Sequence, residues 1–207
     1  NQERIKKWGH RRYVGGGNSE AWYGIGKRQY HFLVANGLEP THKFLDIACG
    51  SLRLGQYLIP MLNAGNYCGV EAEKDLVDAG IEKEILFEII LKKEPKFLIN
   101  HDFNFSDCGG YDYAIAQSLF THLTLDDISR CFTEAYKVAN PGSKFYFTFF
   151  EGNSLNNPQG ASHANRNWHY SYSELQLAAK DVGFSLEYIG NWGHERGQLI
   201  AVATKAR

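Results

Sequence analysis

The stretch Phe44-Leu45-Asp46-Ile47-Ala48-Cys49-Gly50-Ser51-Leu52-Arg53-Leu54-Gly55 decides the fold of this chain. It is an apolar run that ends in a turn of small residues, which is typical of a buried parallel strand leading into a helix. Gly69-Val70-Glu71 closes the next apolar run, where a carboxylate is placed to accept hydrogen bonds from ribose hydroxyls. The pattern therefore predicts a site for a cofactor that contains a nucleoside.

The turn within this stretch lacks the full set of glycines that a pyrophosphate site uses. Ala48 and Leu52 stand at two of the places where a dinucleotide-binding fingerprint carries glycine. A pyrophosphate requires close approach of the backbone over several glycines, whereas a cofactor without phosphates needs only one or two small residues. The turn therefore favours a cofactor without phosphates.

Two later segments extend the pattern. The first, residues 111–123, reads YDYAIAQSLFTHL, and the second is Ala139-Asn140-Pro141-Gly142-Ser143. Together with the turn after Asp46, they resemble the class I S-adenosylmethionine-dependent methyltransferases, whose fourth-strand and fifth-strand signatures look similar. The resemblance covers Phe44 to about Phe150. It implies S-adenosyl-L-methionine as the cofactor and methyl transfer as the reaction.

Apolar strands alternate with helical patterns along most of the chain. Strands are predicted at 44–48, 67–70, 96–100, 111–116 and 144–150, and helices near 55–62, 74–92 and 125–139. Ser173-Glu174-Leu175-Gln176 is interpreted as a capping box of a helix that ends at Gly183. Two last strands, near 186–192 and 198–205, are expected to pair antiparallel. The predicted fold class is α/β, with a doubly wound, Rossmann-like, mostly parallel sheet that ends in an antiparallel hairpin strand.

The residues before the first core strand predict an N-terminal helical cap. Apolar residues recur at helical spacing over 27–36, and Gly37 stands in the stop position. We therefore expect a cap or lid segment over residues 1–40 and a methyltransferase domain over 41–207. The polar tract 151–160 predicts a long loop, and the 152–170 loop with residues 1–30 is expected to form a lid over the acceptor pocket.

Length and charge restrict the classes of function. The chain has 207 residues, 43% hydrophobic content and a formal net charge of −1, which suits an α/β enzyme and disfavours a nucleic-acid partner. With no transmembrane-length apolar stretch and no signal peptide expected, a cytoplasmic protein without a membrane partner is predicted. The oligomeric state is left open.

The basic residues near the N-terminus are interpreted as a solvated helix face; they are Arg4, Lys6, Lys7, His10, Arg11 and Arg12. The widely spaced cysteines are expected to be reduced thiols; they are Cys49, Cys68, Cys108 and Cys131.

The residues predicted to bind the cofactor come from the ends of the first four strands. Glu71 is expected to take both ribose hydroxyls, and Asp46 to organise the turn amides and attract the cofactor's ammonium group. The resemblance places Asp102 beside the adenine amino group, with Phe103 against the base. At Gln117, the main-chain carbonyl is expected to meet the methionine ammonium. The whole predicted set is Asp46, Ala48, Cys49, Gly50, Ser51, Glu71, Asp102, Phe103, Gln117 and Ser118.

Two residues are candidates for a general base. His122 follows the fourth strand directly, and an imidazole can take a proton near neutral pH. Glu151 at the mouth of the fifth strand is the second candidate, because it is expected to face the acceptor. Methyl transfer from a sulfonium depends chiefly on placing two reactants in line, so positioning without a base stays open as an alternative.

The acceptor side is expected to combine aromatic faces with hydrogen-bonding groups. Such a mixture suits a polar ring-bearing or sugar-like acceptor. The residues predicted there are Tyr13, Trp22, Tyr23, His163, Asn165, Arg166, Trp168, His169 and Tyr170. No close His/Asp/Glu grouping has a ligand-like spacing, so no metal is predicted.

The sequence leads to a methyltransferase acting on oxygen, less favourably nitrogen, of a small polar molecule or glycan. One alternative is an NAD(P)-dependent oxidoreductase, because the strand, turn and helix with Glu71 would serve it too. The other alternative is a non-catalytic cofactor-binding protein of the same fold, since fold does not fix function.

Overall fold

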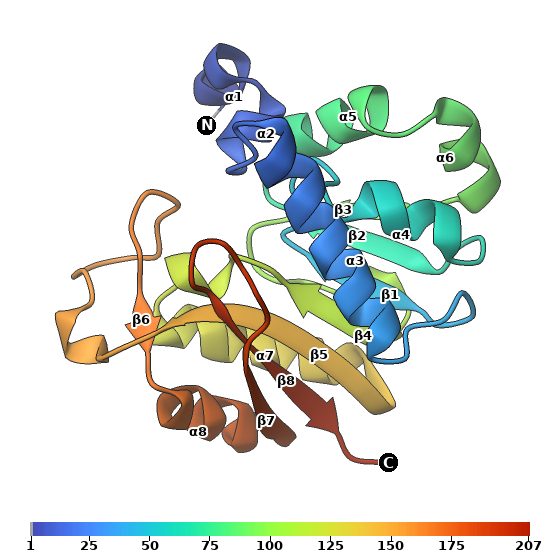
Figure 1. Ribbon diagram of the computed structural model, residues 1–207. Coiled ribbons are helices and arrows are strands. Elements are labelled where there is room, and N and C mark those ends of the chain that lie inside the picture. Colours follow the sequence, from blue (N-terminus) through green and yellow to red (C-terminus); the bar gives the residue numbers. More distant parts are fainter. Residues whose placement is uncertain (1) are drawn as a thin grey trace. The chain divides into compact units, whose positions relative to one another are not determined.

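The structure is a computed structural model that describes residues 2–207. The chain forms two compact units, Asn1–Asp102 and Phe103–Arg207, each with its own core. In Figure 1 the first unit runs from blue to green, and the second from yellow-green to red.

The first unit combines the N-terminal helices with three parallel strands. Strand β1 pairs with β2, and β2 pairs with β3, both parallel, so the order is β3-β2-β1. The buried strands β1 and β2 carry the apolar runs, as expected for strands covered on both faces. The elements are α1 (Gln2–Trp8), α2 (His10–Tyr13), η1 (Glu20–Gly24), α3 (Ile25–Ala35), β1 (Phe44–Ile47), α4 (Gly55–Met61), β2 (Tyr67–Glu71), α5 (Lys74–Lys83), α6 (Phe87–Lys93) and β3 (Lys96–Ile99).

The second unit begins parallel and ends antiparallel. Strand β4 pairs with β5 in parallel, while β8 lies antiparallel between β5 and β7, so the predicted terminal hairpin is confirmed. A short strand that the sequence did not predict, β6, pairs with the end of β5. The elements are η2 (Ser106–Cys108), β4 (Tyr111–Ala116), η3 (Phe120–His122), α7 (Leu125–Val138), β5 (Ala139–Glu151), η4 (Ser154–Asn156), β6 (His169–Tyr170), α8 (Tyr172–Val182), β7 (Phe184–Asn191) and β8 (Leu199–Lys205).

A cluster of phenylalanines holds the second unit together. Phe132 of α7 lies 5.3 Å, ring centre to ring centre, from both Phe120 and Phe147, and Phe145 lies 5.8 Å from it. Most of these pairs meet edge to face, the arrangement that aromatic quadrupoles favour. This packing fixes η3, the turn that carries His122, against the centre of β5.

Two local predictions are wrong in detail. The capping box of α8 uses Ser171 with Glu174, because these two side chains satisfy each other's main-chain N–H groups, so the helix begins two residues earlier than Ser173 implied. Strand β5 begins at Ala139, ahead of the predicted start at residue 144, and a register irregularity between Tyr111 and Tyr113 accommodates the extra residues.

The cysteines differ from the prediction of four reduced thiols. Cys49 and Cys131 are buried free thiols. Cys68 and Cys108 are disulfide-bonded, so the prediction is wrong for these two residues. Within residues 2–207, no helix is both long enough and apolar enough to cross a membrane.

Candidate active site

The turn after β1 adopts a left-handed backbone at alternate positions. The φ angles are 58° at Ala48, 55° at Gly50 and 65° at Leu52, although only Gly50 lacks a Cβ. Left-handed non-glycine residues cost free energy and persist where the surroundings hold them. Here Leu52 is fully buried, and a Cβ at Gly80 of α5 would lie only 2.7 Å from its Cγ, so the glycine lets α5 pack on the turn. The backbone of this turn thus has the left-handed conformation typical of a glycine-rich loop, although Ala48 and Leu52 are not glycines.

Glu71 at the end of β2 holds this turn. Its carboxylate accepts the Gly50 N–H at 2.9 Å through Oε2, and the Ala72 and Glu73 N–H groups at 2.9 and 3.1 Å through Oε1. Burial raises the pKa of Glu71 above its ordinary 4.5, although these three hydrogen bonds oppose the rise. Three of about four acceptor positions are therefore taken by amides. A ribose that donates two hydroxyls must displace or share one of them.

Asp46 has a different partner from the one predicted. Its Oδ2 accepts the Tyr67 hydroxyl at 2.7 Å, and both side chains are buried. The Gly50 amide of the turn is held by Glu71, so the predicted role in organising that amide passes to Glu71. Burial raises the pKa of Asp46 to about 7, with the Tyr67 hydrogen bond acting against the rise and the charge on Glu71 adding to it. Asp46 can thus be neutral or charged near physiological pH.

The segment 10–14 lies over the turn. Ser51, fully buried, has its Oγ 3.5 Å from the His10 carbonyl oxygen, and a Cβ at Gly50 would lie 3.2 Å from Cγ1 of Val14. The predicted acceptor residue Tyr13 is half-buried in this segment, and burial together with the charge on Glu73 raises its pKa. The N-terminal segment is therefore part of the first unit and covers the turn.

A buried carboxylate, Glu84, anchors this segment. It receives the His10 ring at 2.6 Å, the Arg11 guanidinium at 2.7 and 2.8 Å, and the Trp22 indole N–H at 3.2 Å. Burial acts to raise the pKa of Glu84, but the hydrogen bonds from Arg11 and His10 outweigh it and hold the pKa below 4.5. The interpretation of the basic run as a solvated face is therefore wrong for His10 and Arg11.

In the second unit, the predicted residues Gln117 and Ser118 belong to a polar cluster. Ser118 has a left-handed φ of 58°, and its N–H donates to Thr148 Oγ1 at 2.7 Å. His194 and Gln198, from the connection between β7 and β8, complete the cluster. Thr148, His194 and Gln198 were not predicted from the sequence. Thr148 left one signal, as a polar residue within the apolar run of β5.

His122 is held in a defined protonation state. Its Nδ1 lies 2.8 Å from the Arg166 carbonyl oxygen, which can only accept, so Nδ1 carries the proton and Nε2 keeps a lone pair. Burial lowers the pKa of His122 below 6.5, and the charge on Arg196 acts in the same direction. The neutral ring is therefore favoured, with Nε2 able to accept a proton.

The other candidates near the strand ends are less enclosed. Glu151 is exposed, and the Tyr188 hydroxyl donates to it at 3.3 Å. Asp102 is exposed at the end of the first unit. Phe103 has a φ of 60°, and the Arg130 guanidinium lies 5.7 Å from its ring centre. Cys49 is buried, and burial raises its thiol pKa well above 9.0.

The predicted acceptor residues divide by burial. Tyr23, His163, Arg166 and His169 are exposed, with His169 stacked 5.3 Å from Phe150, ring centre to ring centre. Three others are buried, so their role in contacting an acceptor stays a prediction; they are Trp22, Trp168 and Tyr170, 0%, 2% and 3% exposed. Asn165 is exposed beside His163.

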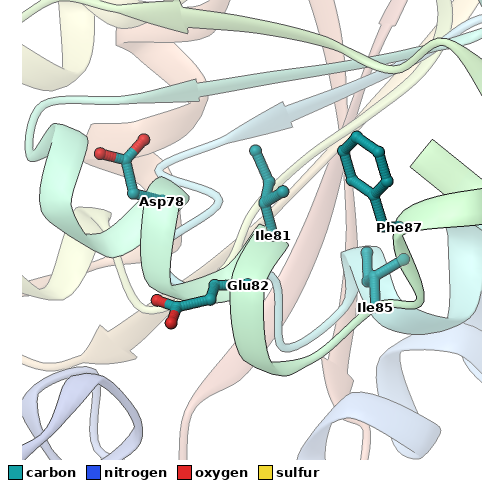
Figure 2. Close-up of a pocket in the computed structure, with 5 residues that line it drawn as sticks. All are labelled: Asp78, Ile81, Glu82, Ile85 and Phe87. Carbon is teal, nitrogen blue, oxygen red and sulfur yellow. The ribbon is translucent and has the colours of Figure 1, made fainter. Parts of the chain in front are cut away.

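A depression on the first unit lies on α5, apart from the turn after β1. Figure 2 shows Ile81, Ile85 and Phe87 gathered on one side of it, with the carboxylates of Asp78 and Glu82 on the other. None of the residues predicted from the sequence lines it. Over residues 2–207, no group of three or more His, Cys, Asp or Glu side chains is arranged to hold a metal ion.

No protein-family model matches the sequence. Magnesium protoporphyrin IX methyltransferase from Synechocystis PCC 6803 with bound S-adenosylmethionine is 19% identical, with a TM-score of 0.70 over 100% of this chain and 93% of that chain. With bound S-adenosylhomocysteine, the same enzyme gives 18%, a TM-score of 0.72, and coverage of 100% and 95%. An S-adenosylmethionine-dependent methyltransferase from Clostridium acetobutylicum is 12% identical, with a TM-score of 0.69 over 100% of both chains. The chain therefore has the fold of these methyltransferases, and the predicted fold class is confirmed.

Proposed function

We propose that this chain is an S-adenosylmethionine-dependent methyltransferase that acts on oxygen, or less favourably nitrogen, of a small polar molecule or glycan. The observation that carries the proposal is the buried Glu71 carboxylate bound to the Gly50 amide, at the turn after β1 of this fold. An identity of 19% shows a shared fold only, so the methyl acceptors of the neighbouring enzymes are not assigned to this chain.

The charges at the turn favour a cofactor without phosphates. The amide that a pyrophosphate would use at Gly50 is already bound by the carboxylate of Glu71, and a phosphate placed there would meet a like charge. Ribose hydroxyls and an ammonium group are donors, which carboxylates accept. The Glu71 carboxylate at the turn therefore favours S-adenosylmethionine over NAD(P) as the cofactor.

His122 is the residue we assign to proton transfer. The bound cofactor supplies a methyl group made electrophilic by a positively charged sulfur. Nε2 of His122 would accept the proton of the acceptor oxygen during methyl transfer. The Arg166 carbonyl supports this role, because it fixes the proton on Nδ1 and stabilises the imidazolium that forms. Glu151 ranks second, because it is exposed and bonded to Tyr188.

Isothermal titration calorimetry of the purified chain with S-adenosylhomocysteine, NAD⁺ and NADP⁺ tests the proposal. We expect binding of S-adenosylhomocysteine alone. Binding of a nicotinamide cofactor without S-adenosylhomocysteine would support the oxidoreductase instead. A screen for transfer of a labelled methyl group to small polar and glycan acceptors then separates an enzyme from a non-catalytic binder.

A further inference from the structure

Five polar side chains meet inside the second unit at the ends of β4 and β5. Thr148, His194 and Gln198 are 0%, 6% and 3% exposed, and Gln117 and Ser118 are half-buried beside them. Buried polar groups must pair donor with acceptor, so the position of each proton can be worked out.

The ring of His194 determines how Gln117 is oriented. Nδ1 of His194 accepts the Arg196 N–H at 3.2 Å, so in the neutral ring Nε2 carries the proton. The side-chain amide atom of Gln117 that lies 3.1 Å from Nε2 must then be an acceptor. An amide nitrogen there would set two N–H donors against each other. Since the two ends of an amide have the same shape, the chemistry requires the oxygen at this position.

Ser118 leads to the same orientation independently. The same amide atom of Gln117 lies 2.6 Å from Ser118 Oγ. That distance is typical of O–H···O and short for N–H···O, so the serine hydroxyl donates to the Gln117 oxygen. Because the Ser118 hydroxyl hydrogen goes to Gln117, Gln198 donates to Ser118 Oγ from its amide nitrogen at 2.7 Å, and its amide oxygen accepts the Thr148 hydroxyl at 2.8 Å.

We infer that Gln117 accepts hydrogen bonds from both His194 and Ser118, and that Thr148, His194 and Gln198 are positioning residues for the Gln117–Ser118 turn. Ser118 is held in its left-handed conformation by its N–H on Thr148 and by Thr121 Oγ1, which donates to its carbonyl at 2.9 Å. The function of this arrangement rests on the proposed methyltransferase activity. There it fixes the Gln117 main-chain carbonyl that receives the cofactor's ammonium.

The protonation state of His194 tests the hydrogen-bond scheme without any ligand. Nitrogen-detected NMR of the whole chain is expected to give the Nε2–H form for His194. The Gln117→Glu variant keeps an acceptor oxygen toward both donors, so it should keep that form. The isosteric Gln117→Met variant offers no acceptor and should lower the melting temperature. An Nδ1–H form in the parent protein, or equal melting temperatures for the two variants, would overturn the scheme.

The positioning role is tested separately at Thr148. Thr148→Val keeps the shape but leaves the Ser118 N–H without its acceptor, whereas Thr148→Ser keeps the hydroxyl. We expect Thr148→Val to weaken S-adenosylhomocysteine binding about tenfold at a temperature where the variant is folded. Thr148→Ser should bind S-adenosylhomocysteine as the parent does. A loss of melting temperature with unchanged affinity would overturn the positioning role. Absence of S-adenosylhomocysteine binding by the parent protein would overturn the proposed function and leave the NMR result standing.

Discussion

Replacing Glu84 with alanine should release the N-terminal segment from the first unit. The carboxylate is 2% exposed and receives His10, Arg11 and Trp22. Arg11 is 36% exposed and can turn to water, so its loss contributes little. The larger cost comes from His10 and from the Trp22 N–H, whose side chain is fully buried. Leaving these two groups unpaired costs about 2–4 kcal/mol.

That free energy corresponds to an increase of about 30- to 1,000-fold in the open fraction of the segment. Limited trypsin digestion measures it, because the segment contains Arg11 and Arg12, and cleavage follows the open fraction when closing is fast. Glu82→Ala is the matched control, since Glu82 is exposed in the last turn of α5, two residues before Glu84. If Glu84→Ala were cleaved no faster than this control, Glu84 would not be the anchor.

The same carboxylate gives the segment a defined pH dependence. The pKa of Glu84 is lowered in the folded chain, so its stabilisation is present above the ordinary pKa of 4.5 and is lost as pH falls through the folded value. Trypsin cannot be used in that range, so pepsin digestion or hydrogen exchange of residues 10–24 is the measurement. Faster opening on acidification in the parent, and none in Glu84→Ala, is the expected result.

Three further changes test the proposed site. Glu71→Ala should weaken S-adenosylhomocysteine binding by about 1–3 kcal/mol in calorimetry. The control Glu73→Ala keeps the Glu71 carboxylate and should bind as the parent does. Equal losses in the two variants would mean that Glu71 does not bind the ribose. His122→Ala should lower turnover about 100-fold and remove the acidic limb of the pH profile at saturating cofactor, while Glu151→Ala stays near normal; normal turnover in both would mean that positioning alone carries the reaction. Asp46→Asn should remove one contribution to the pH dependence of unfolding. The folded pKa of Asp46 is raised from 3.8 to about 7, so its contribution to the unfolding free energy is greatest below pH 3.8 and falls as pH rises to about 7. Urea unfolding of parent and variant across that range measures it, and an unchanged slope would contradict the buried neutral acid.

The positions of the strands along the chain could be predicted because each one depends on a short-range pattern. The run from Phe44 to Ile47 is mostly apolar and buried throughout, and residues 111–116 were predicted with the bounds that β4 has. Element ends were less certain where two polar residues competed, as at the start of α8, where Ser171 and Ser173 can both cap. Strand β6 has two residues and leaves no periodicity to find.

The site was predictable only where one strand end supplies one residue. Glu71 was found because it closes β2 directly after Val70. Its partner amides, and the contact of Asp46 with Tyr67, depend on how β1 and β2 are paired in register, which composition does not encode. Glu84 was missed because a carboxylate at a helix end is ordinarily solvated, and only tertiary packing brings His10 and Arg11 to it.

The left-handed turn after β1 bears on how the glycine pattern should be interpreted. In the sequence, Ala48 and Leu52 at two glycine places favour a cofactor without phosphates, yet both residues have the positive φ angles that glycine adopts most readily. The path of a glycine-rich loop is thus retained without the glycines, and the cost is offset by the packing of Leu52 and by the Glu71 carboxylate on the Gly50 amide. It is therefore the carboxylate of Glu71, and not the missing glycines, that disfavours a phosphate-containing cofactor at this turn. A Glu71→Gln variant that gained affinity for NAD⁺ would support this role of the Glu71 charge directly.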